Sequence, residues 1–246
     1  MARDEAANVT RCVEGARALV AEVLVVDTGS RDDTAALARA AGARVLEVDW
    51  RGYGPTKNWG AERAEHDWIV SLDADEVPDA ALADALRSLD LAEPREVFGL
   101  RRVTQFRGHW VRHGDWGGDV VWRVYHRGRA GWDARPVHER LVGLGGDEQL
   151  RRTVLPGELL HYSYPDAASL ARKHALYVRL GAESLLAEGR RPSWVKRHVA
   201  PAWRAFRGYV LRGGWRDGWA GRQVALADYR MVRDKYRALA ELLGRR

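Results

Sequence analysis

Carboxylates stand at the ends of two short apolar segments of this 246-residue sequence. Asp27 closes the run EVLVVD, and Asp73 and Asp75 lie at the end of WIVSLDADE. Such runs are typical of buried strands, and α/β sheets bind ligands at the carboxyl ends of their strands. Two carboxylates one residue apart suit a Mg²⁺ or Mn²⁺ ion that takes further ligands from a diphosphate. The alternative is that Asp73, Asp75 and Glu76 only cap a helix that begins at Pro78, and that Asp27 is a turn or cap residue.

Strands and helices alternate around these carboxylates. Strands are predicted over residues 22–27, 44–49 and 68–73, and helices over residues 8–18, 30–41 and 56–65. Ser30 is the predicted cap of the second helix, and Pro78 is predicted to lie in the first turn of a fourth. This alternation indicates an α/β fold with a largely parallel sheet and helices on both faces.

The predicted secondary structure changes twice further along the chain. Between about residues 97 and 164 short strands are separated by Gly-rich turns. Helices are then predicted over residues 167–188, 193–212 and 217–243. The chain is therefore divided into two halves of one α/β domain, residues 1–96 and 97–165, and a helical C-terminal extension, residues 166–246.

Composition restricts the class of protein only loosely. The formal charge of +6 and the pI of about 9.7 are compatible with nucleic acid, an anionic membrane or a phosphorylated substrate. Cys12 is the single cysteine, which excludes an internal disulfide and a cysteine-based metal cluster. Neither a signal peptide nor an apolar run long enough to span a bilayer is visible. We expect a cytoplasmic protein.

Several segments resemble a known family. VVDTGSRDDT and DWIVSLDADE are similar to the nucleotide-binding half of family 2 glycosyltransferases, which have the GT-A fold. GYGPTKNWGAERA, HGDWGG, RVYHRGR, RPVHERL and LLHYSY resemble the subgroup of lipopolysaccharide core glucosyltransferases that act on inner-core heptose. The resemblance covers nearly the whole chain.

This resemblance implies a Rossmann-like mixed sheet flanked by helices. Residues 1–96 would bind a nucleotide sugar, and residues 97–165 would hold the acceptor and the catalytic base. The implied activity is an inverting, metal-dependent transfer of glucose or another hexose from a nucleotide-diphosphate donor. The acceptor would be the lipopolysaccharide core or another glycan of the cell envelope.

The resemblance also assigns roles at the donor site. Asp27 would contact the base of the donor, and Asp73 would lie near the ribose and the metal. Asp75 would bind the Mg²⁺ or Mn²⁺ ion, with His161 approaching it from the opposite side. Lys57 would face the donor phosphates, although a solvated lysine at a helix start is an equally good interpretation.

An inverting transfer needs one general base for the acceptor hydroxyl. Glu139 in RPVHERL is favoured over Asp119 in GDWGGD, and a surface carboxylate paired with arginine is the alternative for each. His138 would bind the metal or the diphosphate, or would serve the structure alone. The acceptor sugar would be held by aromatic and hydrogen-bonding side chains of the HGDWGG region: Arg112, His113 and Trp116.

The sequence departs from the family at its start. The family has an apolar strand before a turn that corresponds here to Arg3, Asp4 and Glu5. That strand, which lies between EVLVVD and WIVSLD in the family, is absent from the sequence. We expect its two neighbours to be left with unpaired backbone groups, and an upstream start would supply it.

Three alternatives remain open for function and placement. A sugar nucleotidyltransferase also holds a metal through carboxylates on an α/β sheet, and an impaired relative would bind the donor alone. A basic, Trp-rich binding module is the non-enzymatic alternative. Tryptophans alternate with cations in the C-terminal extension, which indicates contact with the inner leaflet of the membrane or a helical bundle with a solvated basic face. No nucleic-acid motif accompanies them, and no nucleic-acid partner is expected.

Overall fold

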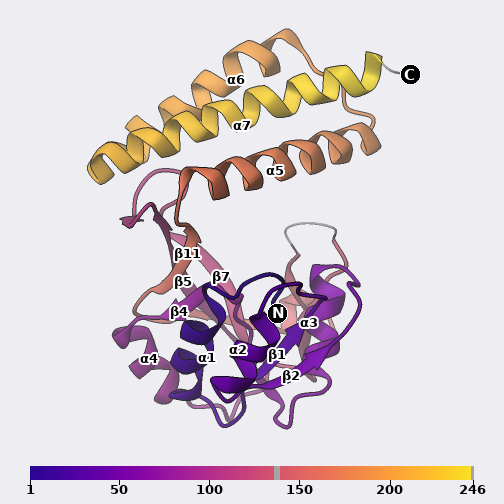
Figure 1. The fold of residues 1–246 in the computed structure, drawn as a ribbon, viewed down its shortest axis with the longest axis vertical. Helices are drawn as coiled ribbons and strands as arrows, with labels where there is room; N and C mark the ends of the chain where they lie inside the picture. The colour runs from indigo at the N-terminus through magenta and orange to yellow at the C-terminus, as the bar shows by residue number, and fades with distance from the viewer. Residues whose placement is uncertain (136–138, 245–246) are drawn as a thin grey trace. The chain divides into compact units, whose positions relative to one another are not determined.

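The computed structural model describes residues 1–135 and 139–244, and these fall into two compact units (Figure 1). Unit 1 comprises Met1–Arg102 and Asp119–His161, and unit 2 comprises Val103–Gly118 and Tyr162–Arg246. The α/β class, the mixed sheet and the C-terminal helices expected from the sequence are all present.

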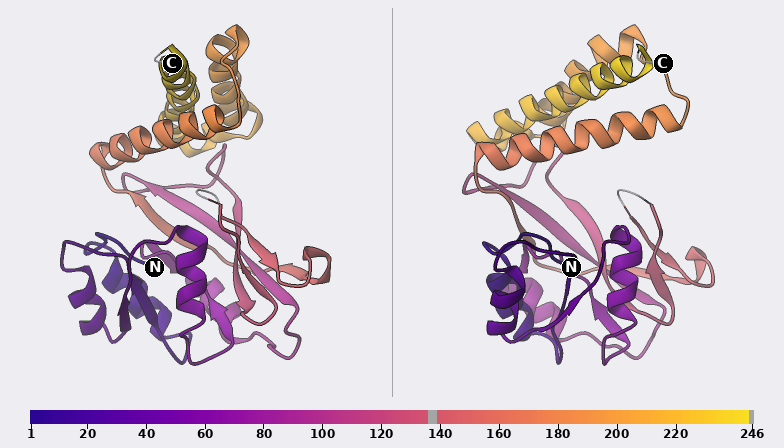
Figure 2. Two further views of the ribbon diagram at one scale, coloured as in Figure 1. Left: turned by 90° about the vertical axis from the view of Figure 1, so that its right-hand side faces the viewer. Right: turned by 45° about the vertical axis from the view of Figure 1, so that its right-hand side comes forward.

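Unit 1 holds the segments that the sequence analysis expects to bind a nucleotide (Figure 2). Its helices are α1 (Val9–Arg17), α2 (Thr34–Ala40), α3 (Tyr53–Ala61) and α4 (Ala80–Arg87), with a 3₁₀ turn at Asp147–Gln149. Its strands are β1 (Leu24–Asp27), β2 (Arg44–Glu47), β3 (Trp68–Val70), β4 (Glu76–Pro78), β7 (Asp119–His126), β8 (Ala130–Trp132), β9 (Leu141–Gly143) and β10 (Arg151–Val154). Two further strands run from unit 1 into unit 2: β5 (Glu96–Phe106) and β11 (Leu159–Tyr164).

The strands form three sheets rather than one. The larger sheet has the order β3-β7-β5-β11-β4, with β6 and β10 also paired to β5. The strands β1 and β2 pair in parallel with each other, and β8 pairs with β9. The prediction of a largely parallel sheet is wrong for the larger sheet, in which β3–β7, β5–β7 and β4–β11 are antiparallel. Helical connections between strands, which are the usual crossovers of parallel pairs, occur in the first part of unit 1, and the parallel pair β5–β10 is connected without an α-helix.

Two predicted helix starts are displaced, for identifiable reasons. Glu76 and Pro78 belong to β4, which pairs with β11, so α4 begins at Ala80 instead. Asp79 caps α4 by accepting a hydrogen bond from the backbone N–H of Leu82 at 2.8 Å. The idea that the carboxylates after β3 serve only to cap this helix is therefore wrong.

The helix after β1 also begins later than predicted. Asp33 is the N-cap of α2, and Ser30 lies outside the helix. The Ser30 hydroxyl instead accepts a hydrogen bond from the backbone N–H of Asp4 at 3.0 Å. Ser30 thus ties the N-terminal loop to the turn after β1.

The place expected for the absent first strand is open in the part of the chain that the structure describes. A cavity of about 630 Å³ is lined by apolar side chains of β1, β3 and α1, among others. Ala2 pairs in parallel fashion with β1, through Ala2 N–H to Val26 O at 2.9 Å and Thr28 N–H to Ala2 O at 3.0 Å. Ala2 thus forms an isolated bridge at the edge of β1.

Filling this cavity is expected to stabilise unit 1. A version of the protein with an extended apolar segment placed before Met1 should bury two or three aliphatic side chains, a contribution of roughly 3–6 kcal/mol. Urea denaturation of the two versions measures the difference. The same segment with charged residues at its apolar positions is the control, and equal midpoints for both segments would contradict this use of the cavity.

Unit 2 is built around three long helices. They are α5 (Ala167–Ala187), α6 (Trp194–Phe206) and α7 (Gly218–Gly244). Short elements complete the unit: β6 (His109–Val111), a π-helical turn at Arg207–Leu211 and a 3₁₀ turn at Gly214–Asp217. The helices α5 and α6 both pack against α7, and α6 continues through Pro201. None of the described helices is long and apolar enough to cross a bilayer.

A buried carboxylate ties the segment before β7 to the helices of unit 2. The Asp115 side chain is fully buried and forms ion pairs with Arg204, Arg207 and Arg212, the last two at 2.8 and 2.9 Å. Because a buried charge is costly unless it is paired, these three contacts fix the π-helical turn against the HGDWGG segment.

A second acid, Asp228 on α7, lies near this cluster and gives a pH-dependent prediction. Burial raises the pKa of Asp228 to about 6, so its contribution to folding is present below its unfolded pKa and is lost as pH rises through about 6. We expect Asp228→Asn to raise the free energy of unfolding at pH 7 by up to roughly 2 kcal/mol and to change it little near pH 4. Urea denaturation at both pH values tests this, and an equal change at both would contradict it.

Candidate active site

Asp27 lies at the carboxyl end of β1, in the turn that leads toward α2. Its Oδ1 accepts hydrogen bonds from the backbone N–H groups of Gly29 and Ser30, both at 2.9 Å. Gly29 has φ +85°, a conformation that favours glycine. The Asp27 Oδ2 is buried and has no hydrogen-bond partner among the described residues. A buried acceptor without a donor is costly, so this oxygen is suited to a ligand.

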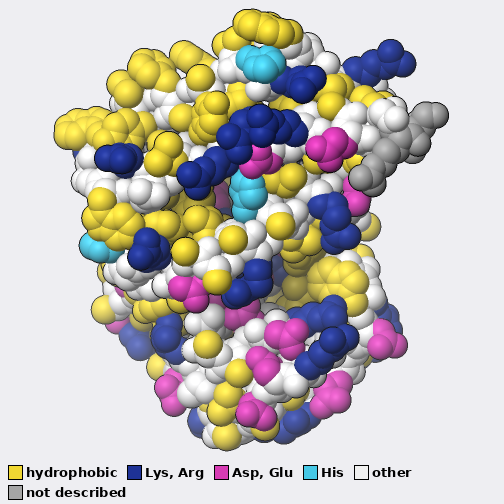
Figure 3. Space-filling view, turned by 45° about the horizontal axis from the view of Figure 1, so that its top comes forward, with side chains coloured by type: hydrophobic (Ala, Val, Ile, Leu, Met, Phe, Trp, Pro, Cys, Tyr) yellow, Lys and Arg dark blue, Asp and Glu magenta, His cyan; other side chains and the backbone are white. Residues whose placement is uncertain are grey.

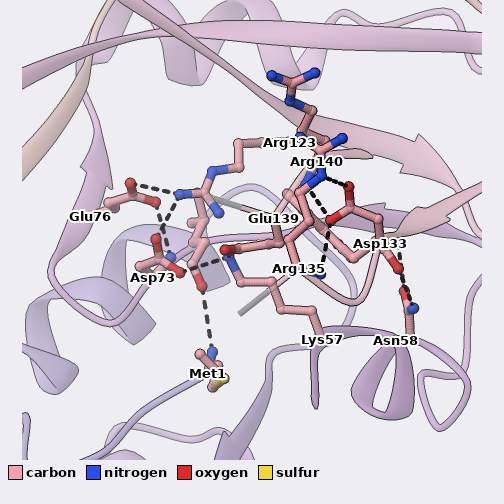
Figure 4. A network of polar contacts seen from close by, with 12 residues as sticks. Met1, Lys57, Asn58, Asp73, Glu76, Arg123, Asp133, Arg135, Glu139 and Arg140 are labelled. Atoms are coloured by element: carbon pink, nitrogen blue, oxygen red, sulfur yellow. Dashed lines mark hydrogen bonds and ion pairs between the residues drawn. The ribbon is translucent and has the colours of Figure 1, made fainter. Parts of the chain in front are cut away.

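Asp73, after β3, lies at the centre of a network of charges (Figure 4). Its Oδ2 accepts from Arg123 at 2.6 Å, and its Oδ1 lies 3.2 Å from Lys57 Nζ. The N-terminal ammonium of Met1 donates to the backbone oxygen of Leu72 at 3.5 Å. Two side-chain cations and the chain terminus therefore gather around one carboxylate.

The electrostatics of this network keep Asp73 ionised. Burial opposes ionisation of Asp73, but Arg123 and Lys57 outweigh it and hold its pKa well below the usual range. Burial likewise lowers the pKa of the Met1 ammonium. Asp73 thus supplies a negative charge that is already balanced by fixed cations.

Glu139 reaches the same network from the segment before β9. Its Oε1 accepts from Lys57 Nζ at 2.8 Å, and its side chain is largely buried. Lys57 Nζ also lies 4.6 Å from the centre of the Trp132 ring. Asn58 holds Trp132 in place through two backbone hydrogen bonds of 2.8 Å. α3 and β8 together therefore position the lysine between Asp73 and Glu139.

Asp75 and His161 form a second pair beside this network. His161 Nε2 lies 3.2 Å from Asp75 Oδ2, because the pairing of β11 with β4 places His161 opposite Glu76. Glu76 itself is fully buried, and its Oε1 accepts from Arg123 at 2.9 Å and from Arg102 at 3.3 Å. The predicted proximity of Asp75 and His161 is present in the structure.

Asp75 and His161 are better suited than Asp73 to be ligands of a divalent cation. A carboxylate oxygen and an imidazole nitrogen are both ligands of Mn²⁺-type ions, whereas both Asp73 oxygens already face cations. Among the described residues no cluster of three or more His, Cys, Asp or Glu side chains has the spacing of a metal site. An ion held by Asp75 and His161 would therefore need a ligand such as a diphosphate to complete its coordination.

The remaining predicted residues lie elsewhere or outside the described residues. Asp119, at the start of β7, is half exposed and pairs with Arg102 at 2.7 Å. His138 lies outside the described residues.

The predicted acceptor residues all belong to unit 2. Trp116 stacks on Tyr164 with ring centres 4.9 Å apart, and His113 Nδ1 lies 2.8 Å from Asp217. Asp217 also accepts from the backbone N–H of Arg112 at 3.1 Å.

Three residues of the network were not predicted from the sequence: Arg123, Glu76 and Asn58. Arg123 carried the clearest signal, because it is a single cation inside the apolar strand DVVWRVYH and must turn into the core there. Glu76 was considered only as a helix cap. Asn58 follows Lys57 directly, but nothing in the spacing pointed to Trp132.

Comparison with known proteins decides the family. The family model described as glycosyl transferase family 2 matches residues 1–143. The chain belongs to glycosyl transferase family 2. The transferase is 32% identical over 228 residues to the lipopolysaccharide core biosynthesis glycosyltransferase LpsC of Rhizobium meliloti, a match that covers 89% of this chain and 82% of LpsC. The predicted family and enzyme class are thereby confirmed.

Two further similar proteins share a lower identity with the transferase. An uncharacterised glycosyltransferase of Rickettsia prowazekii is 23% identical over 217 residues, covering 85% of this chain and 74% of that protein. Among solved structures, glucosyl-3-phosphoglycerate synthase from Mycobacterium tuberculosis, in complex with Mn²⁺, uridine diphosphate and glucosyl-3-phosphoglycerate, is 19% identical with a TM-score of 0.43. That likeness covers 78% of this chain and 79% of the synthase.

Proposed function

We propose that this transferase moves a hexose, with inversion, from a nucleotide-diphosphate donor to the lipopolysaccharide core or another envelope glycan. The observation that carries the proposal is the arrangement at the ends of β1 and β3. A buried carboxylate oxygen of Asp27 without a partner and the Asp75–His161 pair belong to the same unit. The similarity to LpsC over most of both chains supports the choice of acceptor.

Acidic and basic side chains bind different parts of the donor. Asp27 Oδ2 accepts a hydrogen bond from the base, and Lys57 faces the phosphates while Asp73 lies near the ribose. Asp75 and His161 would hold Mg²⁺ or Mn²⁺, and the ion would offset the negative charge on the departing diphosphate.

Glu139 is the proposed general base. Its carboxylate takes the proton of the acceptor hydroxyl as that oxygen forms a bond to the anomeric carbon. The bond from the anomeric carbon to the diphosphate oxygen breaks on the opposite face, so the configuration inverts and the nucleoside diphosphate leaves. Lys57, which contacts both Glu139 and Asp73, orients the carboxylate. His138 and Asp119 are the alternative participants, and Trp116, Arg112 and His113 are proposed to contact the acceptor.

The products separate this function from that of a nucleotidyltransferase. We expect nucleotide sugar incubated with the protein and Mn²⁺ or Mg²⁺ to yield free nucleoside diphosphate, and EDTA to stop the release. Pyrophosphate as the product would favour the nucleotidyltransferase instead. Donor binding without any turnover, also in the version with an apolar segment before Met1, would indicate a relative that only binds the donor.

A further inference from the structure

One face of α6 is apolar and uncovered. Four of its exposed apolar side chains, at positions 195, 199, 203 and 206, recur every three or four residues, the spacing of a single helix face. We call this face the α6 stripe, and it consists of Val195, Val199, Trp203 and Phe206, with Trp194 at the start of the helix and Val210 and Leu211 of the following turn at its ends. Trp194 is 69% exposed and Trp203 54%, values that are high for aromatic side chains, which proteins normally bury.

The stripe is unpartnered within unit 2 because α6 packs on α7 with its other side. Pro201, on that other side, is buried, and the α6–α7 contact is the most extensive between the helices of the unit. Scattered exposed apolar residues need no explanation, but a contiguous row on one helix marks an interaction surface.

Cations surround the stripe and acids are absent from it. Between Gly189 and Arg216 the sequence has eight Lys or Arg residues and no Asp or Glu. Three of these arginines pair with Asp115. Within the described residues no ion pair is recorded for Arg191, Lys196, Arg197 or Arg216, which leaves their charge available. Figure 3 shows hydrophobic side chains gathered in its upper part with Lys and Arg side chains among them and few acidic ones.

An apolar stripe surrounded by cations favours an anionic lipid surface over a second copy of the chain as its binding partner. A second copy bringing the same face would place like charges opposite each other, since a two-fold interface pairs each patch with itself. An anionic lipid surface instead receives the tryptophan rings at the level of its headgroups and attracts each nearby cation. Charge complementarity therefore points to lipid.

We propose that the α6 stripe lies on the surface of a membrane that contains anionic phospholipid. The helix rests in the plane of the interface, with the stripe in the boundary between headgroups and acyl chains and Lys196 beside the phosphates. This interaction goes beyond the proposed transfer reaction and does not depend on it, because it requires neither the donor nor the metal.

Sedimentation with lipid vesicles tests the proposal on the full chain. The protein should bind vesicles of phosphatidylglycerol and phosphatidylcholine, and bind phosphatidylcholine alone much more weakly. Trp194→Ser, Trp203→Ser and Phe206→Ser together should weaken binding by roughly tenfold or more, because the lost rings contribute apolar burial. Lys196→Gln should weaken binding to the anionic vesicles by about fivefold.

Matched changes and a second measurement keep the result interpretable. Trp50→Ser with Leu144→Ser removes exposed apolar side chains of unit 1 and should leave vesicle binding unchanged. Brominated phosphatidylglycerol should quench part of the wild-type tryptophan fluorescence. Equal binding by the stripe variant and the wild type would overturn the proposal. The proposal would also be overturned if the wild-type protein did not bind the vesicles and instead formed dimers through the stripe, as measured by analytical ultracentrifugation. Either outcome leaves the proposed transferase activity untouched.

Discussion

Asp75→Ala is expected to abolish sugar transfer. Asp75 provides the carboxylate that faces His161 at 3.2 Å. Without Asp75, a divalent cation would keep only one of the two proposed protein ligands, His161. Loss of charge stabilisation on a departing diphosphate costs several kcal/mol, which corresponds to a fall in kcat of roughly 10³-fold or more. The assay is release of nucleoside diphosphate at saturating Mn²⁺.

Asp67→Ala is the matched control for this change. Asp67 lies just before the opposite end of β3, and its side chain is more than half exposed in a pair with Arg127. Surface pairs of this kind contribute little to stability, so the control should keep near-normal turnover. Turnover of Asp75→Ala equal to that of Asp67→Ala would remove the metal assignment.

Glu139→Gln is expected to lower kcat by roughly 10²-fold or more, because a positioned general base contributes that much to a proton transfer. The amide oxygen can still accept a hydrogen bond from Lys57, so the donor should bind as tightly as before. Calorimetric titration with a nucleoside diphosphate and steady-state kinetics measure the two effects separately. Weaker donor binding with an unchanged kcat would mean that Glu139 only orients Lys57.

The same substitution at Asp119 distinguishes the two predicted bases. Asp119 is half exposed and paired with Arg102, away from the Lys57–Glu139 contact. Asp119→Asn should therefore reduce kcat far less than Glu139→Gln. The reverse order of effects would transfer the role of base to Asp119.

The sequence was sufficient to predict the placement of the acids, because apolar runs and strand ends are local features. The runs EVLVVD and WIVSLD contain the strands β1 and β3 of unit 1; Asp27 is the last residue of β1, and Asp73 lies three residues after the end of β3. Helix starts were less predictable. Ser30 accepts a hydrogen bond from the N-terminal loop, and Pro78 belongs to β4, so neither begins a helix.

The charge network around Asp73 could not be predicted from the sequence, because it depends on pairing between distant strands. Arg123 reaches Asp73 and Glu76 only because β7 pairs with β3 in one register. A shift of that register by one residue would turn Arg123 to the other face of the sheet. The Asp115 cluster of unit 2 has the same origin, since its three arginines lie about ninety residues away along the chain.

The central claim is that unit 1 binds a nucleoside diphosphate through a divalent cation at Asp75 and His161. Calorimetric titration of the wild-type chain with a panel of nucleoside diphosphates, in Mn²⁺ and in EDTA, tests it most directly. We expect at least one nucleotide to bind in Mn²⁺, binding to be lost in EDTA, and Asp75→Ala to behave in Mn²⁺ as the wild type does in EDTA. Equal affinity with and without the metal, or no binding of any nucleotide, would contradict the claim.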